Sequence, residues 1–126
     1  MKKKPNRKLL VRKLDKAVSE FVRERDKVCV QCGSDLQLGN GHIFTRTNYS
    51  TRWDISIDGN CHCQCWKCNF FHSQRDNWKY YSWYIDKFGQ EKFDILYQRH
   101  NQVAKITTYE LEIKLEEIKN GKRKND

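Results

Sequence analysis

Two pairs of cysteines constrain this chain more than any other feature of its sequence. The first pair is Cys29 and Cys32, followed by Gly33, and the second pair is Cys65 and Cys68. Each pair has the spacing C-x2-C, which directs two thiolates at one point, and two such pairs supply the four donors of a tetrahedral zinc site. The spacing therefore predicts a structural Zn²⁺ ion, which would contribute folding free energy to a chain with only 37% hydrophobic residues.

The alternative for the C-x2-C pairs is a redox dithiol, but that motif usually occurs once in a chain, between a strand and a helix. The Lys-rich start is not followed by the apolar segment of a signal peptide, and no apolar run approaches the ~20 residues of a membrane span. We therefore expect a cytoplasmic protein that is not secreted, with reduced cysteines that bind metal. Cys61 and Cys63 are expected to be buried core residues, with extra metal ligation as the alternative.

The positive charge is concentrated near the start of the chain. The 126 residues include 25 Lys and Arg against 16 Asp and Glu, and residues 1–27 alone hold 11 basic and 4 acidic side chains. A dense basic segment favours nucleic acid, because cationic side chains neutralise phosphates and release counterions. A solvated helix face is the alternative. The candidate DNA-binding residues in this segment are Lys2, Lys3, Lys4, Arg7 and Lys8.

Composition divides the chain into three segments of one compact domain. Residues 1–27 form a basic arm and an amphipathic helix, residues 28–75 form a centre rich in Cys, Gly, Asn and Thr, and residues 76–126 form further helices. The layout predicts an α+β fold in which a small zinc-stabilised centre is flanked by helices.

Local patterns predict the individual elements. Apolar residues at helical spacing predict a helix over Lys8–Asp26 and another over 78–88, which Gly89 ends. Thr107–Glu110 has the pattern of a capping box and opens a last helix. Short strands are expected at His42–Thr45 and Ile55–Ile57.

Polar residues stand in a defined order around the cysteines. Gly41-His42-Ile43-Phe44-Thr45-Arg46 lies between the two pairs, and Arg52-Trp53-Asp54 follows it. Asn60 precedes the second pair, Asn69 comes directly after its last cysteine, and His72 follows one turn later. Alone, His42 would most often be a hydrogen-bonded structural histidine. The ordered set is much more specific than any of its members.

This set resembles the phage NinG/Rap recombination endonucleases, which belong to the HNH group of His-Me finger nucleases and are organised like phage endonuclease VII. The resemblance covers roughly residues 25–100 and includes Asn60-Cys61-His62-Cys63-Gln64-Cys65, Cys68-Asn69, Ser73 and Lys87-Phe88-Gly89-Gln90-Glu91. It implies a ββα-metal, treble-clef-like centre. It also implies metal-dependent nicking or cleavage of branched or recombination-intermediate DNA, inside the bacterial host of a phage or prophage.

The resemblance assigns a role to three residues. His42 would be the general base that activates water, because imidazole accepts a proton near neutral pH. Asn60 would hold that imidazole in its productive orientation and tautomer. Asn69 would ligate the catalytic cation, Mg²⁺ or Mn²⁺, which would stabilise charge on the phosphorane and the leaving oxygen.

The catalytic cation needs a second ligand that the pattern leaves open. Many HNH enzymes place an aspartate directly before the histidine. This chain has Gly41 at that position, and the NinG family also has glycine there. Asp54, Asp58 and His72 are the candidates, with Asp54 ranked first.

Two arginines near this segment, Arg46 and Arg52, are candidates for bidentate phosphate contacts, with solvated or structural ion pairs as the alternative. A non-catalytic zinc-dependent module of the same fold that binds DNA or RNA is the alternative function. The resemblance to enzymes of branched DNA also implies a homodimer, with one active centre for each strand, and the helix at Lys8–Asp26 or the one at Thr108–Asn120 would form its interface.

Overall fold

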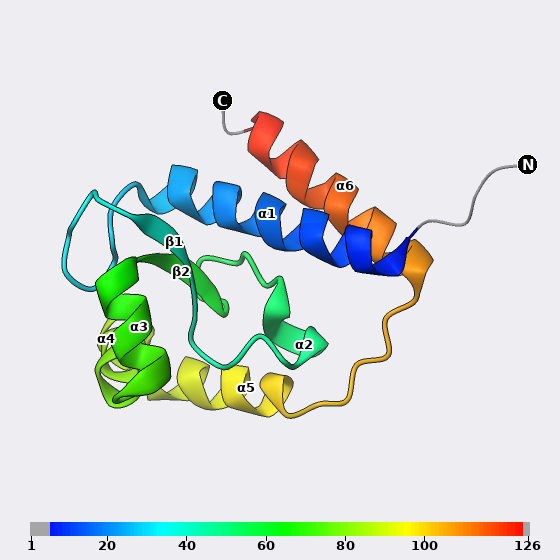
Figure 1. The fold of residues 1–126 in the computed structure, drawn as a ribbon. Helices are drawn as coiled ribbons and strands as arrows, with labels where there is room; N and C mark the ends of the chain where they lie inside the picture. Colours follow the sequence, from blue (N-terminus) through cyan, green and yellow to red (C-terminus); the bar gives the residue numbers. More distant parts are fainter. Residues whose placement is uncertain (1–5, 125–126) are drawn as a thin grey trace, which may run out of the picture.

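The computed structural model describes residues 6–124, and within this range it has six helices and one antiparallel hairpin (Figure 1). The predicted α+β class is confirmed. In chain order the elements are α1 (Arg7–Asp26), β1 (Leu38–His42), α2 (Tyr49–Arg52), β2 (Cys61–Cys65), α3 (Trp66–Gln74), α4 (Trp78–Phe88), α5 (Gln90–His100) and α6 (Thr108–Lys124).

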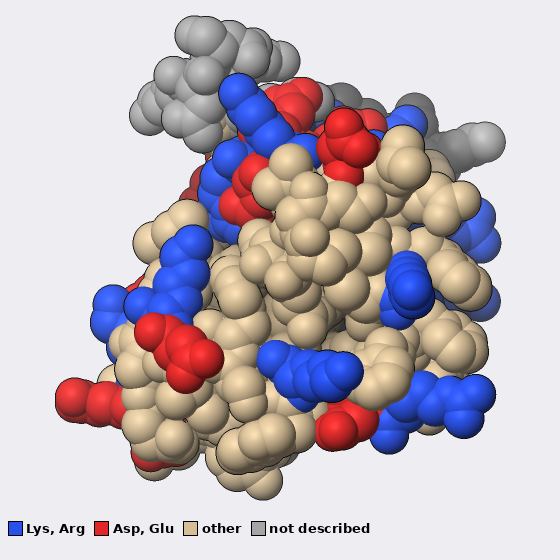
Figure 2. Space-filling model, turned by 90° about the vertical axis from the view of Figure 1, so that its left-hand side faces the viewer, with Lys and Arg blue, Asp and Glu red and all other residues tan. Residues whose placement is uncertain are grey.

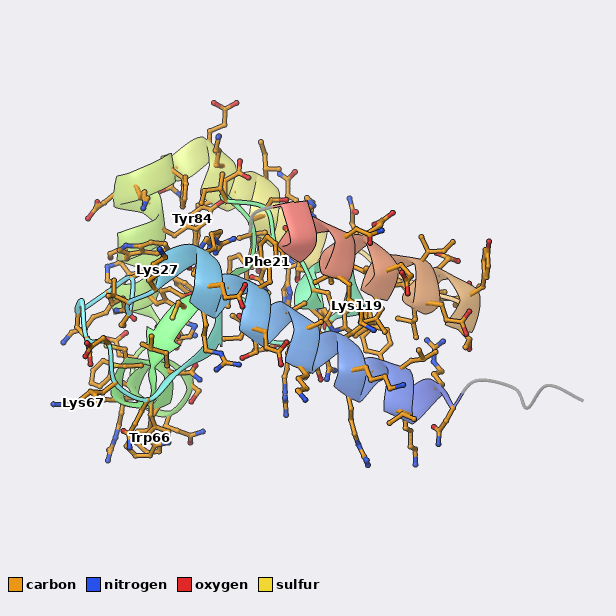
Figure 3. All side chains as sticks on the ribbon, turned by 90° about the horizontal axis from the view of Figure 1, so that it is seen from above. Phe21, Lys27, Trp66, Lys67, Tyr84 and Lys119 are labelled. Atoms are coloured by element: carbon orange, nitrogen blue, oxygen red, sulfur yellow. The ribbon has the colours of Figure 1, made fainter. Side chains whose placement is uncertain are left out.

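Helices α1 and α6 lie side by side on one side of the hairpin, with their first turns together (Figure 1). At this end Arg7 Nη2 donates to the carbonyl of Ile106 at 2.6 Å. The apolar faces of the two helices share one core with Trp53 and Cys61, and Phe21 lies between them (Figure 3). The aliphatic residues of this core are Leu10, Leu14, Val18, Val22, Leu111, Leu115 and Ile118. The two helices predicted to mediate a dimer thus bury their apolar faces within one chain, and the homodimer stays a prediction.

The starts of α1 and α6 and the end of α4 follow the sequence signals, whereas α6 continues through Gly121, where the glycine predicts its end, to Lys124. Helix α1 includes the predicted Lys8–Asp26, and α4 ends at Gly89, whose φ of 95° suits glycine. The capping box before α6 is confirmed, because Glu110 N donates to Thr107 Oγ1 at 3.1 Å and Thr107 N donates to Glu110 Oε1 at 3.4 Å. Among the described helices, none is long and apolar enough to cross a membrane.

The hairpin lies elsewhere than expected. The strands predicted at His42–Thr45 and Ile55–Ile57 are wrong, since β1 ends at His42 and β2 runs through the cysteine-rich segment. His42 pairs with Cys61 and Asn40 pairs with Cys63. All five residues of β2 are buried, and pairing with this strand makes β1 a strand despite the low strand propensity of Gly and Asn.

A second core, rich in aromatic rings, lies on the other side of the hairpin beneath α4 and α5. Phe44 leaves the end of β1 and stacks among rings from both helices, while Tyr80 Oη donates to the carbonyl of Gly41 at 2.8 Å. The rings around Phe44 are those of Tyr81, Phe93, Tyr97 and His100. The segment after His42 is thereby fixed between the two helices and the hairpin.

Candidate functional site

Four cysteines come together where β2 meets α3. Cys29 and Cys32 lie in the turn after α1, and Gly33 closes that turn with a φ of 78°. Cys65 ends β2 and caps α3, and Cys68 lies in the first turn of this helix. The four sulfur atoms all lie within 4.8 Å of one another. A tetrahedral zinc site with Zn–S bonds of ~2.3 Å needs S···S separations of about 3.8 Å, so the cluster can hold a metal ion.

The electrostatics of the cluster also favour a cation. Burial opposes ionisation of Cys29, but hydrogen bonds from backbone groups outweigh it and lower the pKa of this thiol to about 7. Burial and the neighbouring thiols raise the pKa of Cys68. Four thiolates at this spacing repel one another, and a bound dication reverses that repulsion.

The two remaining cysteines lie outside this cluster. Cys61 and Cys63 are fully buried, as expected of core residues. Burial raises the pKa of Cys61 to about 12, and its thiol donates to the carbonyl of Arg52 at 3.2 Å.

Beside the cluster, the end of β1, the segment after it, the middle of α3 and the start of α4 line an open cavity of about 350 Å³. It is lined by Asn40, His42, Ile43, Thr45, Arg46, Asn69, His72, Ser73, Asn77 and Tyr81. Four of the predicted site residues therefore line one cavity: His42, Arg46, Asn69 and His72.

His42 is held in its neutral form. Its Nε2 lies 3.0 Å from the carbonyl of Arg52, and because a carbonyl only accepts, the ring proton is on Nε2 and Nδ1 keeps its lone pair. Burial lowers the pKa of His42 to about 4, more than the hydrogen bond raises it. Near neutral pH the imidazole is thus uncharged and able to accept a proton.

An ion pair from α1 fixes the carbonyl that holds His42. Asp15 accepts from Arg52 Nε at 3.0 Å and Nη2 at 2.6 Å, and from Trp53 Nε1 at 2.8 Å. Burial opposes ionisation of Asp15, but the hydrogen bonds from Arg52 and Trp53 outweigh it and lower its pKa. Asp15 therefore positions His42 through Arg52, a link that the sequence reasoning missed.

His72 faces the same cavity, and like His42 it has its Nε2 bonded to a backbone carbonyl. The residue is 9% exposed, and its Nε2–H donates to the carbonyl of Ile43 at 3.0 Å. Its Nδ1 is buried without a hydrogen-bond partner among the described residues. An orphaned acceptor beside Asn69 is the environment that a cation or a proton donor satisfies, so the cavity fits a divalent ion.

Among the described residues, the side-chain hydrogen bonds of Asn60 go to Phe44 rather than to His42. The Asn60 side chain is fully buried, accepts from Phe44 N at 2.8 Å and donates to Phe44 O at 2.9 Å. It thus clamps the segment that follows His42, while the contact on the imidazole comes from Arg52.

The two aspartates proposed as second ligands lie away from the cavity lining. Asp54 accepts from Arg99 Nη1 at 3.0 Å and from Ser56 N at 3.2 Å, with 8% of its side chain exposed. Asp58 pairs with Lys92 at 3.1 Å. Both carboxylates therefore have structural partners.

The basic candidates are divided between exposed and paired positions. Arg46 is exposed at the cavity, and Lys8 is exposed on α1. Arg52 pairs with Asp15, and Arg7 donates to backbone near α6. Lys2, Lys3 and Lys4 lie outside the described residues. On the face in Figure 2, Lys and Arg side chains are spread over a largely uncharged surface rather than gathered in one patch.

Two residues of the site that were not predicted, Asp15 and Asn40, have a signal in the sequence. Asp15 falls in the helical series Val11, Val18 and Val22 and so faces the interior of the molecule. Asn40 lies two residues before His42, and alternate residues of a strand share a face.

Fold and site together define a small α+β protein with a four-cysteine cluster beside a histidine-lined cavity. The family model described as the bacteriophage lambda NinG protein matches residues 1–125, and the chain belongs to the NinG family. Searches of curated proteins and of solved structures returned no significant match.

Proposed function

We propose that this chain is a metal-dependent endonuclease that hydrolyses phosphodiesters of branched or recombination-intermediate DNA, as the HNH-type resemblance implies. The observation that carries the proposal is the cavity in which His42, Asn69, His72 and Arg46 meet. In this proposal the hairpin and α3 form a ββα-metal centre, and the four-cysteine cluster holds a structural Zn²⁺ ion.

The side chains divide the chemistry as follows. His42 accepts a proton from the attacking water at Nδ1, because Nε2–H is bonded to the carbonyl of Arg52. Arg46 pairs with a phosphate of the substrate through its exposed guanidinium. Asn69 and His72 would hold the divalent cation, Mg²⁺ or Mn²⁺, which when bound supplies charge stabilisation for the pentavalent phosphorus and the leaving oxygen.

The cleavage test uses the full chain on linear, forked, flapped and four-way DNA, with and without Mg²⁺ or Mn²⁺. We expect metal-dependent nicking that prefers the branched substrates, and a ~10²–10⁴-fold slower rate in His42→Ala with DNA binding retained. Uniform cutting of linear duplex would contradict the branched substrate.

A wild-type protein that binds junctions but cuts none of them with either cation would instead be a non-catalytic zinc-dependent module. Competition between RNA and junction DNA for binding separates an RNA-binding module from a DNA-binding one.

A further inference from the structure

Two buried acceptors in the cavity lack partners, and they come from different elements. Asn40 Oδ1 belongs to β1 and His72 Nδ1 belongs to α3, and neither has a hydrogen-bond partner among the described residues. Both side chains line the cavity. The ring of His72 is fixed by its bond to the carbonyl of Ile43, with only 9% of the residue exposed. Two such orphans on one cavity indicate a ligand that satisfies both.

The strand geometry explains why position 40, and not position 41, faces this ligand. Asn40 and His42 are alternate residues of β1 and share a face, whereas Gly41 points to the opposite face. A Cβ atom on Gly41 would lie 1.9 Å from Oε1 and 2.7 Å from Cγ of Gln64, which is buried. An aspartate at position 41 therefore has neither room nor the right direction.

We propose that Asn40 Oδ1 and His72 Nδ1 are ligands of the divalent cation in this cavity, so that Asn40 replaces the carboxylate that position 41 cannot carry. Amide oxygens bind hard cations, and imidazole together with oxygen donors suits Mn²⁺. The proposal rests on the proposed function, because the cation is the one that assists phosphodiester hydrolysis.

The charge of the cavity adds a consequence. Among its lining residues none is Asp or Glu, and Arg46 is cationic. A cation held by neutral donors lacks the Coulombic attraction that a carboxylate supplies, so a phosphate oxygen of the substrate completes the site. Cation and phosphodiester therefore bind cooperatively, and each raises the affinity for the other by the same factor.

The test measures Mn²⁺ binding by electron paramagnetic resonance, on the full zinc-loaded chain, with and without the phosphodiester dinucleotide TpT. We expect Asn40→Ala to weaken Mn²⁺ binding at least ~10-fold and Asn40→Asp to strengthen it by a similar factor. TpT strengthens Mn²⁺ binding to the wild type more than to Asn40→Asp, which carries its own anionic ligand. Asn77→Ala is the matched control, because Asn77 lines the same cavity but is exposed and donates to Tyr81 Oη.

The outcomes separate this inference from the endonuclease itself. Mn²⁺ affinity that is unchanged in both Asn40→Ala and Asn40→Asp, in a protein that cuts DNA, overturns ligation by Asn40 and leaves the endonuclease standing. Binding that depends on Asn40 in a protein that cuts no DNA overturns the endonuclease and leaves the ligation standing. Zinc content and circular dichroism check the fold, and Asn40→Asp gives the answer if Asn40→Ala does not fold, because it keeps the side-chain shape.

Discussion

The four-cysteine cluster and the histidine cavity share the hairpin and α3, and the cluster adds Cys29 and Cys32 from the turn after α1. The two sites differ in how their polar atoms are satisfied. In the cluster, all four sulfur atoms lie within 4.8 Å of one another. In the cavity of about 350 Å³, Asn40 and His72 each present a buried acceptor that has no hydrogen-bond partner within the described part of the chain. Structural metal sites are closed by their own ligands, whereas catalytic sites keep open positions.

Helix α3 connects the two sites. Its first turn carries Cys68, with Cys65 as the capping residue, and its next turns carry Asn69 and His72. Residues four apart lie on one face of a helix, so a metal that fixes Cys68 also fixes the position of His72. With a metal bound, the closed site would therefore stabilise the geometry on which the open site depends.

Removal of zinc should have the largest effect. Structural zinc supplies about 10–16 kcal/mol of apparent binding free energy, which is as large as the net stability of a typical domain, about 5–15 kcal/mol. We therefore expect Cys65→Ala, or stripping of zinc with a strong chelator, to abolish the helical circular dichroism at 25 °C.

Cys63→Ala is the matched control for the zinc experiment, because Cys63 is a buried cysteine outside the cluster. It should keep its zinc and its helices. Retention of native circular dichroism in zinc-free protein would contradict the structural role of the cluster.

Asn60→Ala should have the next largest effect. The substitution leaves the N–H and the carbonyl of Phe44 without their buried partner, at roughly 1–3 kcal/mol for each group. We expect the free energy of urea unfolding to fall by the sum of these two costs, and the variant should retain its zinc. Asn101→Ala, at an exposed position, should change it by less than about 0.5 kcal/mol. Equal effects of the two substitutions would argue against the clamp.

The buried His62, which does not line the cavity, should make the free energy of unfolding depend on pH. Burial lowers the pKa of His62 to about 4 from the ordinary histidine value of about 6.5, and its Nε2–H donates to the carbonyl of Gly59 at 2.7 Å. Between these values the unfolded chain binds a proton that the folded chain does not. Stability is therefore full above pH 6.5 and falls as the pH drops toward 4, by on the order of 3 kcal/mol from this group.

His62→Gln tests this by removing the titration while keeping an amide that donates to Gly59. Chemical unfolding of the zinc-loaded protein at several pH values should show a shallower loss of stability in the variant than in the wild type. Parallel pH profiles would show that His62 is protonated equally in both states.

The sequence predicted the parts of the molecule that have a local signal. Helix α1, the end of α4 at Gly89 and the capping box at Thr107–Glu110 follow from periodicity and end residues. The four-cysteine cluster follows from the C-x2-C spacing of each pair, because this spacing brings two thiols together whatever the structure of the loop between the pairs.

The parts that depend on long-range contacts were not predictable in the same way. The strands were misplaced because Gly and Asn have low strand propensity, and only pairing and burial make Leu38–His42 and Cys61–Cys65 a hairpin. The link from Asp15 through Arg52 to His42 joins α1 to the cavity, and no local pattern indicates that pairing. Arg46 and Arg52 have the same side chain, and only their surroundings in the fold show that Arg46 is exposed at the cavity while Arg52 pairs with Asp15.

Substitution of Arg46 should have the smallest effect, and it should change only the binding of nucleic acid. Its side chain is exposed at the cavity, so Arg46→Gln should leave the free energy of unfolding within about 0.5 kcal/mol of the wild type. Junction DNA should bind a few-fold more weakly, and the slope of log affinity against log salt should shrink by about 1, as expected for one lost phosphate contact.

Arg52→Gln is the matched variant that sharpens the difference between the two arginines. Arg52 donates two hydrogen bonds to Asp15 and is mostly buried in this pair, so its loss leaves a partly buried carboxylate with fewer donors. We expect Arg52→Gln to lower stability and to displace the carbonyl that holds His42, with a salt slope of binding close to that of the wild type. Fluorescence anisotropy of labelled junction DNA across a salt series, with urea unfolding in parallel, separates the two. A reduced salt slope in Arg52→Gln and an unchanged one in Arg46→Gln would reverse the assignment, because the phosphate contact would then belong to the arginine that the fold pairs with Asp15.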